Sequence, residues 1–276
     1  MREFLEMPDQ AQLASPPQKT FTKRDLFNII YLFMVVIPKR AKTIAFLLAA
    51  LFAPALANAQ SLTVLPVTIQ MAPGQMATTL TVINQGDSVV AFQLRSFLWK
   101  QDNSGDQLVP VDTLLASPPL GTIAPHTSQV VRMVLRQPAQ EQEATYRILL
   151  DQIPPPSAPG TVRIALRLSI PIFAEPAIRA LPHLQWRVEA NGQQTSLVAV
   201  NDGNRHDTIR NIVLQTSDGR TLKPQGGASP YVLAGTTHRW QFATVGAPLP
   251  PGAVLHLTAI ADGGHVDQAI PATNGP

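Results

Sequence analysis

The chain of 276 residues contains no cysteine and comparatively few charged residues. Without cysteine it has no disulfide, no thiolate nucleophile and no cysteine-based zinc or iron-sulfur site. Charged residues make up 14% of the chain, whereas an average soluble protein has about 25%. No apolar run reaches the roughly 20 residues that a membrane-spanning helix needs. These absences exclude several classes of enzyme and give no support to a membrane-spanning helix.

Proline is the residue present in excess, at 26 of 276 positions. Because proline breaks helices, this content argues against a helix-rich fold. The hydrophobic fraction of 45% and the mean hydropathy of +0.07 exclude a disordered chain. The length predicts about two domains.

The first 60 residues have the layout of a secretory leader. Basic residues are followed by an apolar run and a short Ala-Asn-Ala stretch, namely Lys39, Arg40 and Lys42, then Thr43 to Leu56, then Ala57 to Ala59. We expect residues 34–59 to be a signal peptide cleaved before Gln60, and residues 1–33 to be an extension or a mis-called start. A second apolar run, Leu26 to Ile37, leaves an N-terminal membrane anchor as the alternative.

The net charge of +3 resides in this leader. Seven of the 21 basic residues and four of the 18 acidic residues precede residue 60, so the rest of the chain is balanced. Nucleic-acid binding through a global basic field is therefore disfavoured.

Short runs with alternating apolar and polar residues, separated by turn residues, recur from Ser61 to Phe173. This spacing is typical of an all-β sandwich. After Glu175-Pro176 the pattern restarts, and Asn191-Gly192 between two alternating runs predicts a hairpin. We expect an all-β protein with an N-terminal domain at 60–175 and a C-terminal domain at 176–276.

One predicted strand, Thr161 to Phe173, carries aliphatic residues along one face. They are Val162, Ile164, Leu166, Leu168, Ile170 and Ile172; Arg163, Ala165, Arg167 and Ser169 lie on the opposite face. In one interpretation this is an internal strand that packs on its own core. In the other, its first half lies at a sheet edge and donates Val162, Ile164, Leu166 and Leu168 to another chain by strand addition. Periodicity alone does not decide between them.

The run Ile164 to Phe173, followed by Pro176, resembles the G1 strand of PapD-like periplasmic pilus chaperones. Other segments agree in order: Pro73-Gly74 with Leu80 to Asn84, Pro118-Pro119, Ile123 to Pro125, Gln129 to Arg132, Tyr146-Arg147 and Ile153-Pro154. The resemblance implies two immunoglobulin-like sandwiches set at an angle and a non-enzymatic chaperone in the periplasm, with no cofactor. It also implies that G1 completes a pilus subunit by donor-strand complementation and that an outer-membrane usher receives the subunit.

The sequence departs from this family at the carboxylate anchor. Familiar members hold the subunit's C-terminal carboxylate with an Arg in the first strand and a Lys late in G1, where this chain has Thr68 and Pro171. With motifs such as Trp99-Lys100-Gln101, this departure resembles the archaic, Csu-like branch.

A carboxylate in a partly desolvated cleft still needs a cation. We therefore expect Arg147 to be the anchor, because it precedes Ile148 on the strand expected to pair with G1. Arg163 and Arg132 are further candidates. The alternative is that these arginines are solvated or pair between domains.

Other sites have weak support in the sequence. No Gly-x-Ser-x-Gly elbow is present, and six scattered histidines do not form a metal-binding pair, so we expect no catalytic or metal site. We expect His206 to be a turn or interdomain hydrogen-bonding residue. A secreted immunoglobulin-like adhesin or carbohydrate-binding module remains the alternative function, with a pilus subunit as a third. Whether the free chaperone self-associates through its G1 edges is left open.

Overall fold

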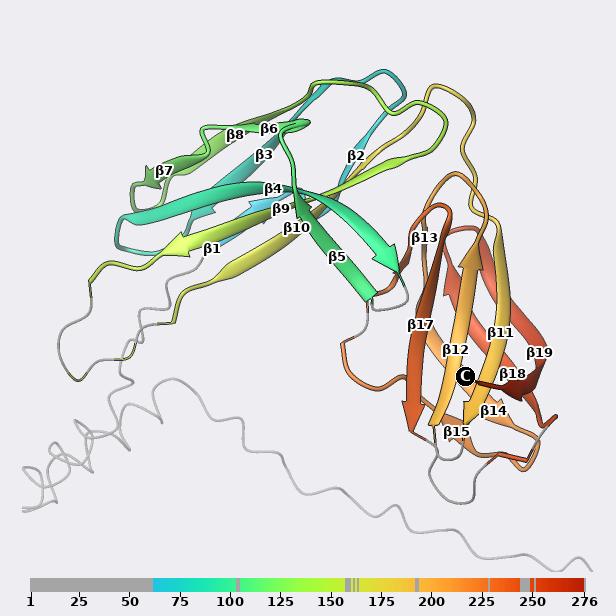
Figure 1. The fold of residues 1–276 in the computed structure, drawn as a ribbon. Helices are drawn as coiled ribbons and strands as arrows, with labels where there is room; N and C mark the ends of the chain where they lie inside the picture. The colour runs from blue at the N-terminus through green and yellow to red at the C-terminus, as the bar shows by residue number, and fades with distance from the viewer. Residues whose placement is uncertain are drawn as a thin grey trace, which may run out of the picture. The chain divides into compact units, whose positions relative to one another are not determined.

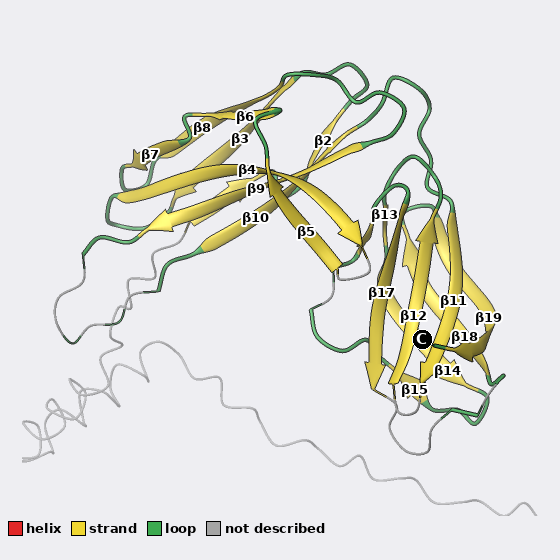
Figure 2. Cartoon of the chain, viewed as in Figure 1, coloured by secondary structure: helices red, strands yellow, loops and turns green. Residues whose placement is uncertain are grey.

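The computed structural model describes residues 62–102, 105–156, 160, 162, 164–191, 194–227, 229–243, 249–250 and 252–275. Every regular element in these ranges is a β-strand (Figure 2). No helix of the described residues is long and apolar enough to span a bilayer. The predicted leader, residues 1–33 and 34–59, lies outside the described residues.

The first ten strands form a two-layer sandwich (Figure 1). One sheet has the order β1-β3-β8-β6, and the other has the order β2-β10-β9-β4-β5, with β7 pairing with β4. The bounds are β1 Leu62–Leu65, β2 Ile69–Met71, β3 Ala77–Asn84, β4 Val90–Asp102, β5 Gly105–Pro110, β6 Leu114–Ser117, β7 Leu120–Ile123, β8 Ser128–Leu135, β9 Ala144–Ile153 and β10 Arg167–Ala174.

The second sandwich is built from one continuous run of seven paired strands, β15-β14-β18-β19-β11-β12-β17, with the short pair β13-β16 beside it. The bounds are β11 Leu184–Asn191, β12 Gln194–Asn201, β13 Asp207–Thr208, β14 Arg210–Thr216, β15 Thr221–Leu222, β16 Tyr231–Val232, β17 Thr236–Ala243, β18 Val254–Ala261 and β19 Gly264–Asn274. The prediction of an all-β chain with two immunoglobulin-like sandwiches is confirmed.

Each sandwich has its own core, because alternate residues of each strand point inward. The first core draws its residues from Leu62 to Ala174, and the second from Val188 to Ala272. The predicted domain boundary at 175/176 lies between these two sets and remains a prediction.

Candidate functional site

Strand β10 has an open edge over its first half. It pairs with β9 along its whole length, from Arg167 opposite Asp151 to Ala174 opposite Ala144. On its other side β2 pairs only with the last three residues, Ile172–Ala174. In the described part of the chain, the backbone of residues 167–171 therefore faces no strand on that side. An open edge of this kind is a template for another chain.

The strand begins later than its alternation predicts. Residues 162 and 164–166 are not in a strand, and β10 starts at Arg167. The last cross-strand bonds join Gln152 and Leu166: the Gln152 N–H donates to the Leu166 carbonyl at 2.9 Å, and the Leu166 N–H donates to Gln152 Oε1 at 3.3 Å. Strand β9 then ends at Ile153, before three consecutive prolines that have no N–H to donate. Val162, Ile164 and Ala165, the described residues just before Leu166, therefore pair with no described strand.

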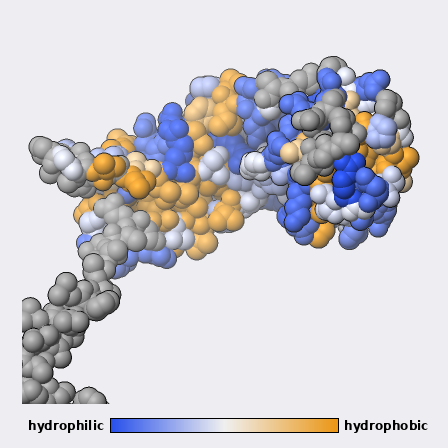
Figure 3. All heavy atoms as spheres, turned by 90° about the horizontal axis from the view of Figure 1, so that it is seen from below, coloured by the Kyte–Doolittle hydropathy of each residue, from blue (hydrophilic) through white to orange (hydrophobic). Residues whose placement is uncertain are grey.

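The aliphatic row divides into an exposed half and a buried half. Val162 is 93% exposed and Ile164 is 91% exposed, while Leu166 is 38% exposed. Leu168 packs against the first core from its edge, and Ile170 and Ile172 lie inside it. Packing on the protein's own core thus describes the second half of the row, and only the first half is free to contact another molecule. Figure 3 shows apolar residues gathered over the first sandwich on one face of the molecule.

A cluster of charges holds the start of β10 on the outer face of its sheet. Asp151 of β9 forms ion pairs with Arg95 of β4, at 2.7 Å, and with Arg167 of β10. Burial alone would raise the pKa of Asp151, but hydrogen bonds and charge from both arginines outweigh it and hold that pKa below its usual value. The cluster joins three adjacent strands next to the exposed segment.

Arg147 lies further along the same outer face. It is directly opposite Pro171 of β10 in the register, and Thr68 comes one residue before the first β2–β10 pair, Ile69 opposite Ile172. The structure thus brings Arg147 into line with Pro171 and Thr68, the two positions at which the resemblance expects cations. Arg147 supplies a positive charge in that row.

The environment of Arg147 is largely aromatic. Its guanidinium carbon lies 3.7 Å from the centre of the Trp99 ring and 5.6 Å from that of Tyr231. Burial lowers the pKa of Arg147, and the negative charge of Asp106 opposes that shift. No carboxylate in the described residues lies within ion-pair distance of Arg147. This half-buried cation therefore retains the capacity to bind an anion.

The other two anchor candidates are placed differently. Arg132 lies on β8, exposed on the opposite sheet of the sandwich, where it faces Thr79 of β3 and Ser117 of β6. The structure does not bring it into the row of Arg147. Arg163 lies outside the described residues.

Contacts between the two sandwiches converge near Arg147. Trp99 and Phe173 of the first sandwich form a buried cluster with Leu233 of the second, and Tyr231 packs against it. The side-chain amide of Gln101 joins the two sandwiches beside this cluster. Its Nε2 donates to the Tyr231 carbonyl at 2.8 Å, and its Oε1 accepts from the Leu233 N–H at 2.9 Å. Sequence reasoning singled out Trp99 and Gln101 only as part of a motif.

A buried pair of titratable side chains joins the sandwiches beside this cluster. His206 Nδ1 lies 2.6 Å from Glu143 Oε2, and the His206 backbone N–H donates to the same oxygen at 2.9 Å. The His206 ring also stacks on Phe173 at 3.6 Å between centroids. The prediction that His206 is an interdomain hydrogen-bonding residue is confirmed, but the sequence contained no signal for Glu143 as its partner.

Comparison with known proteins identifies the first sandwich. Residues 61–179 match the family model described as the pili and flagellar-assembly chaperone, PapD N-terminal domain. No curated protein sequence matches the chain at a significant level.

Solved structures agree with this match at the level of the fold. A chain of the Acinetobacter baumannii CsuC–CsuE chaperone–tip adhesion subunit complex, from archaic Csu pili, is 21% identical, with a TM-score of 0.57. The match covers 78% of this chain and all of that one. The YadV chaperone is 14% identical, with a TM-score of 0.54, and covers 76% of this chain and 98% of its own. A chain of the Salmonella enterica SafA pilin–SafB chaperone complex is 15% identical, with a TM-score of 0.52. The match covers 77% of this chain and 96% of that one.

The fold, with an open strand edge in the first sandwich, is thus the fold of the two-sandwich PapD-like chaperones. The match of residues 61–179 to the PapD N-terminal domain model, together with the shared fold, confirms the resemblance seen in the sequence. The role of that family is non-enzymatic. Among the described residues, no group of three or more potential metal ligands lies together.

Proposed function

We propose that this protein is a periplasmic chaperone that captures a pilus subunit by adding β10, and the segment before it, to the subunit's incomplete sheet. The observation that carries the proposal is the coincidence of two features at one place: a strand with one unpaired edge, and aliphatic side chains left in solvent just before it. Strand addition uses the backbone of an open edge for affinity and alternate side chains for specificity.

The exposed side chains supply the driving force for capture. Burying Val162 and Ile164, which are almost fully exposed, contributes roughly 1.5–3 kcal/mol each. Leu166 contributes a smaller amount because it is already partly covered, and Leu168 completes the donor set at the edge of the chaperone's own core. Ordering the segment on binding offsets part of this gain. The balance suits a complex that is specific and still able to exchange its subunit.

We further propose that Arg147 anchors the subunit's C-terminal carboxylate. A guanidinium can bind a carboxylate through two hydrogen bonds, and this one is partly desolvated without an ion-pair partner in the described chain. Its alignment with Thr68 and Pro171 supports the assignment. Arg132 and Arg163 remain weaker proposals, the first because it lies on the opposite sheet.

Export and delivery complete the proposal. A signal peptide at residues 34–59 would carry the chain to the periplasm, and an outer-membrane usher would receive the loaded chaperone. These two steps rest on the leader pattern and the family resemblance. The similarity to the complex from archaic Csu pili supports a place in the archaic branch.

The test is co-expression of the full chain with a candidate pilus subunit, followed by co-purification and measurement of the complex mass. We expect a one-to-one complex that is lost on Leu166→Asp, because an unpaired carboxylate would have to enter the subunit's apolar groove. The matched control is Leu115→Asp, which changes a similarly exposed leucine (42% against 38%) on the opposite sheet.

Normal recovery of subunit with folded Leu166→Asp would contradict strand donation. A stable chain that captures no subunit would instead direct attention to an adhesin or sugar-binding module. The structure offers little for that alternative, because none of the three tryptophans is exposed: Trp99 and Trp240 are buried, and Trp186 is partly buried against Trp240.

A further inference from the structure

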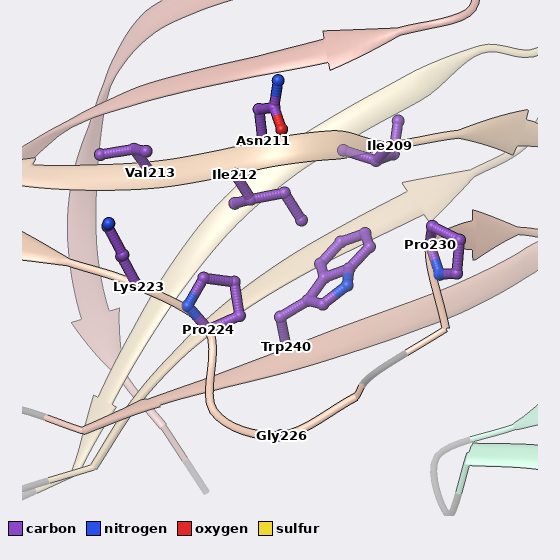
Figure 4. A pocket seen from close by; sticks show the side chains of 9 residues that line it. All are labelled: Ile209, Asn211, Ile212, Val213, Lys223, Pro224, Gly226, Pro230 and Trp240. Carbon is purple, nitrogen blue, oxygen red and sulfur yellow. The ribbon is translucent and has the colours of Figure 1, made fainter. Parts of the chain in front are cut away.

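The second sandwich contains a hollow beside strand β14, which is remote in sequence from β10. The hollow has a volume of about 490 Å³ and is lined by Ile209, Asn211, Ile212, Val213, Lys223, Pro224, Gly226, Pro230 and Trp240. Figure 4 shows Ile212 of β14 pointing toward the Trp240 ring, with Pro224, Gly226 and Pro230 of the facing segment across from it. A volume of this size is within the usual range for small-molecule sites.

The backbone explains why the hollow exists. Segment 223–230 is fixed at both ends: Pro224 bridges to Phe242 of β17, and the Pro230 carbonyl accepts the Ile209 N–H at 2.7 Å. Between these points it carries Gly226 in a left-handed conformation, with φ of 71° and no atom near the position of a Cβ. The described residues of this segment that line the hollow are Lys223, Pro224, Gly226 and Pro230.

The lining has a consistent chemistry. Ile209, Ile212 and Trp240 belong to the buried core and form an apolar floor, to which Val213 and the two prolines add apolar walls. The polar lining residues are Asn211 and Lys223, both exposed, and no carboxylate lines the hollow. Lys223 makes no ion pair with any described residue. An apolar floor with one unpaired ammonium beside it complements a molecule with an apolar body and an anionic head.

We propose that this hollow, here called the Trp240 pocket, binds a small amphiphilic anion of the alkyl carboxylate type. The alkyl chain lies along Ile212 and Trp240, and the carboxylate lies beside Lys223. The assignment is independent of subunit capture, because none of the pocket residues belongs to β10 or to the row of Arg147.

The test is a titration of the full chain with octanoate, decanoate and dodecanoate below their micellar concentrations, followed by calorimetry and by tryptophan fluorescence. Affinity should rise about fourfold for each added methylene and then level off once the pocket is full. Decanol should bind more weakly than decanoate, and decyltrimethylammonium should bind least. Trp240 contacts the pocket, so its emission should change with the same saturation curve.

Variants distinguish the pocket from adsorption elsewhere. Lys223→Gln should weaken decanoate about two- to fivefold, the scale of a partly exposed ion pair, and should leave decanol unchanged. Val213→Asp should weaken both ligands at least tenfold by placing a charge in the apolar wall. The control is Val254→Asp, since Val254 is an exposed valine of the same sandwich outside the pocket.

Equal binding of decanoate by the wild type, Lys223→Gln and Val213→Asp would overturn the proposal. So would an affinity that keeps rising with chain length without a plateau, because that is the behaviour of non-specific adsorption. Subunit capture measured on the same variants should be unchanged, so failure here and failure of the chaperone proposal are separate results.

Discussion

Arg147, the proposed carboxylate anchor, has no ion-pair partner among the described residues. Its guanidinium rests on the Trp99 ring, and this cation–π contact offsets part of the desolvation that lowers its pKa. The acidic charge that acts on its pKa is that of Asp106, which forms no ion pair with it. Such a cation gains more from an incoming carboxylate than a solvated one does, because little further desolvation is needed.

Replacement of this residue gives the first prediction at this scale. Arg147→Ala should weaken subunit binding roughly ten- to a hundredfold, the range for a hydrogen bond to a charged group. The subunit affinity of Arg147→Lys should fall between those of Arg147→Ala and the wild type, because an ammonium keeps the charge but cannot form the two parallel hydrogen bonds of a guanidinium. Surface plasmon resonance with purified subunit measures the affinity, and calorimetric unfolding checks that both variants are folded.

Arg132→Ala is the matched control, since Arg132 lies exposed on the opposite sheet. It should bind the subunit as the wild type does. If Arg147→Ala kept full affinity while Arg132→Ala lost it, the anchor assignment would be reversed.

At the scale of the element, β10 serves two purposes along its length. Its C-terminal half is an inner strand, held by β9 and β2, with Ile170 and Ile172 in the core. Its N-terminal half has one partner only, and the ion pairs of Asp151 hold it there. Because β10 is held in the sheet, the exposed side chains of Val162 and Ile164, just before it, extend from a fixed strand.

The Asp151 cluster gives a prediction with a definite pH dependence. The folded pKa of Asp151 lies below its ordinary value of 3.8, so its stabilisation is present at neutral pH and is lost as the pH falls below about 4, through the lowered pKa. Asp151→Asn should reduce the free energy of unfolding by about 1 kcal/mol at pH 7, the upper range for partly exposed ion pairs. Urea denaturation at a series of pH values measures this, and the difference between variant and wild type should shrink in acid.

Asp112→Asn provides the comparison, because Asp112 is largely exposed and its nitrogen–oxygen distance to Arg136 is 3.9 Å. It should have little effect at any pH. A constant difference between Asp151→Asn and the wild type from pH 7 into acid would show that the cluster acts through packing and not through charge.

At the scale of the whole molecule, the two sandwiches are joined by buried polar groups as well as by aromatic packing. The side chains of Glu143 and His206 are 0% and 2% exposed, and Glu143 Oε1 has no hydrogen-bond partner in the described residues. Removing one member of a buried pair leaves the other without compensation in a medium of low polarity.

We predict that His206→Ala lowers the free energy of unfolding by about 3–5 kcal/mol. The stacking of His206 on Phe173 adds a packing term to this loss. In a double-mutant cycle, Glu143→Ala should lower the free energy of unfolding much less in the His206→Ala background than in the wild type, because the partner of Glu143 is already absent. Calorimetric or denaturant unfolding measures all four proteins.

The matched control is His183→Ala. Its partner is Asp202, and both side chains are well exposed, at 70% and 51%. The expected loss is under 1 kcal/mol. Additive effects of the His206 and Glu143 changes would rule out direct coupling between the two side chains.

Local alternation in the sequence was enough to predict the class of fold and the strands with a strongly apolar face. Strands with weak alternation were missed, as β19 shows: only Ile270 and Ala272 of its eleven residues are buried. Its identity as a strand comes from pairing with β18, the preceding strand of a tight hairpin, and with β11, which lies far away in the chain. The pairing with β11 is non-local and leaves little trace in the residues of β19 itself.

For the site, the sequence by itself determined which residues form the aliphatic row and that Arg147 is on the strand beside it. It did not determine where the row leaves the core. That point was decided by the tertiary structure, because β9 ends at Ile153 and β2 reaches only Ile172, so Val162 and Ile164 have no strand to cover them. The pairing of Glu143 with His206 was decided in the same way. Alternation is a property of one strand, whereas exposure depends on where its neighbours stop.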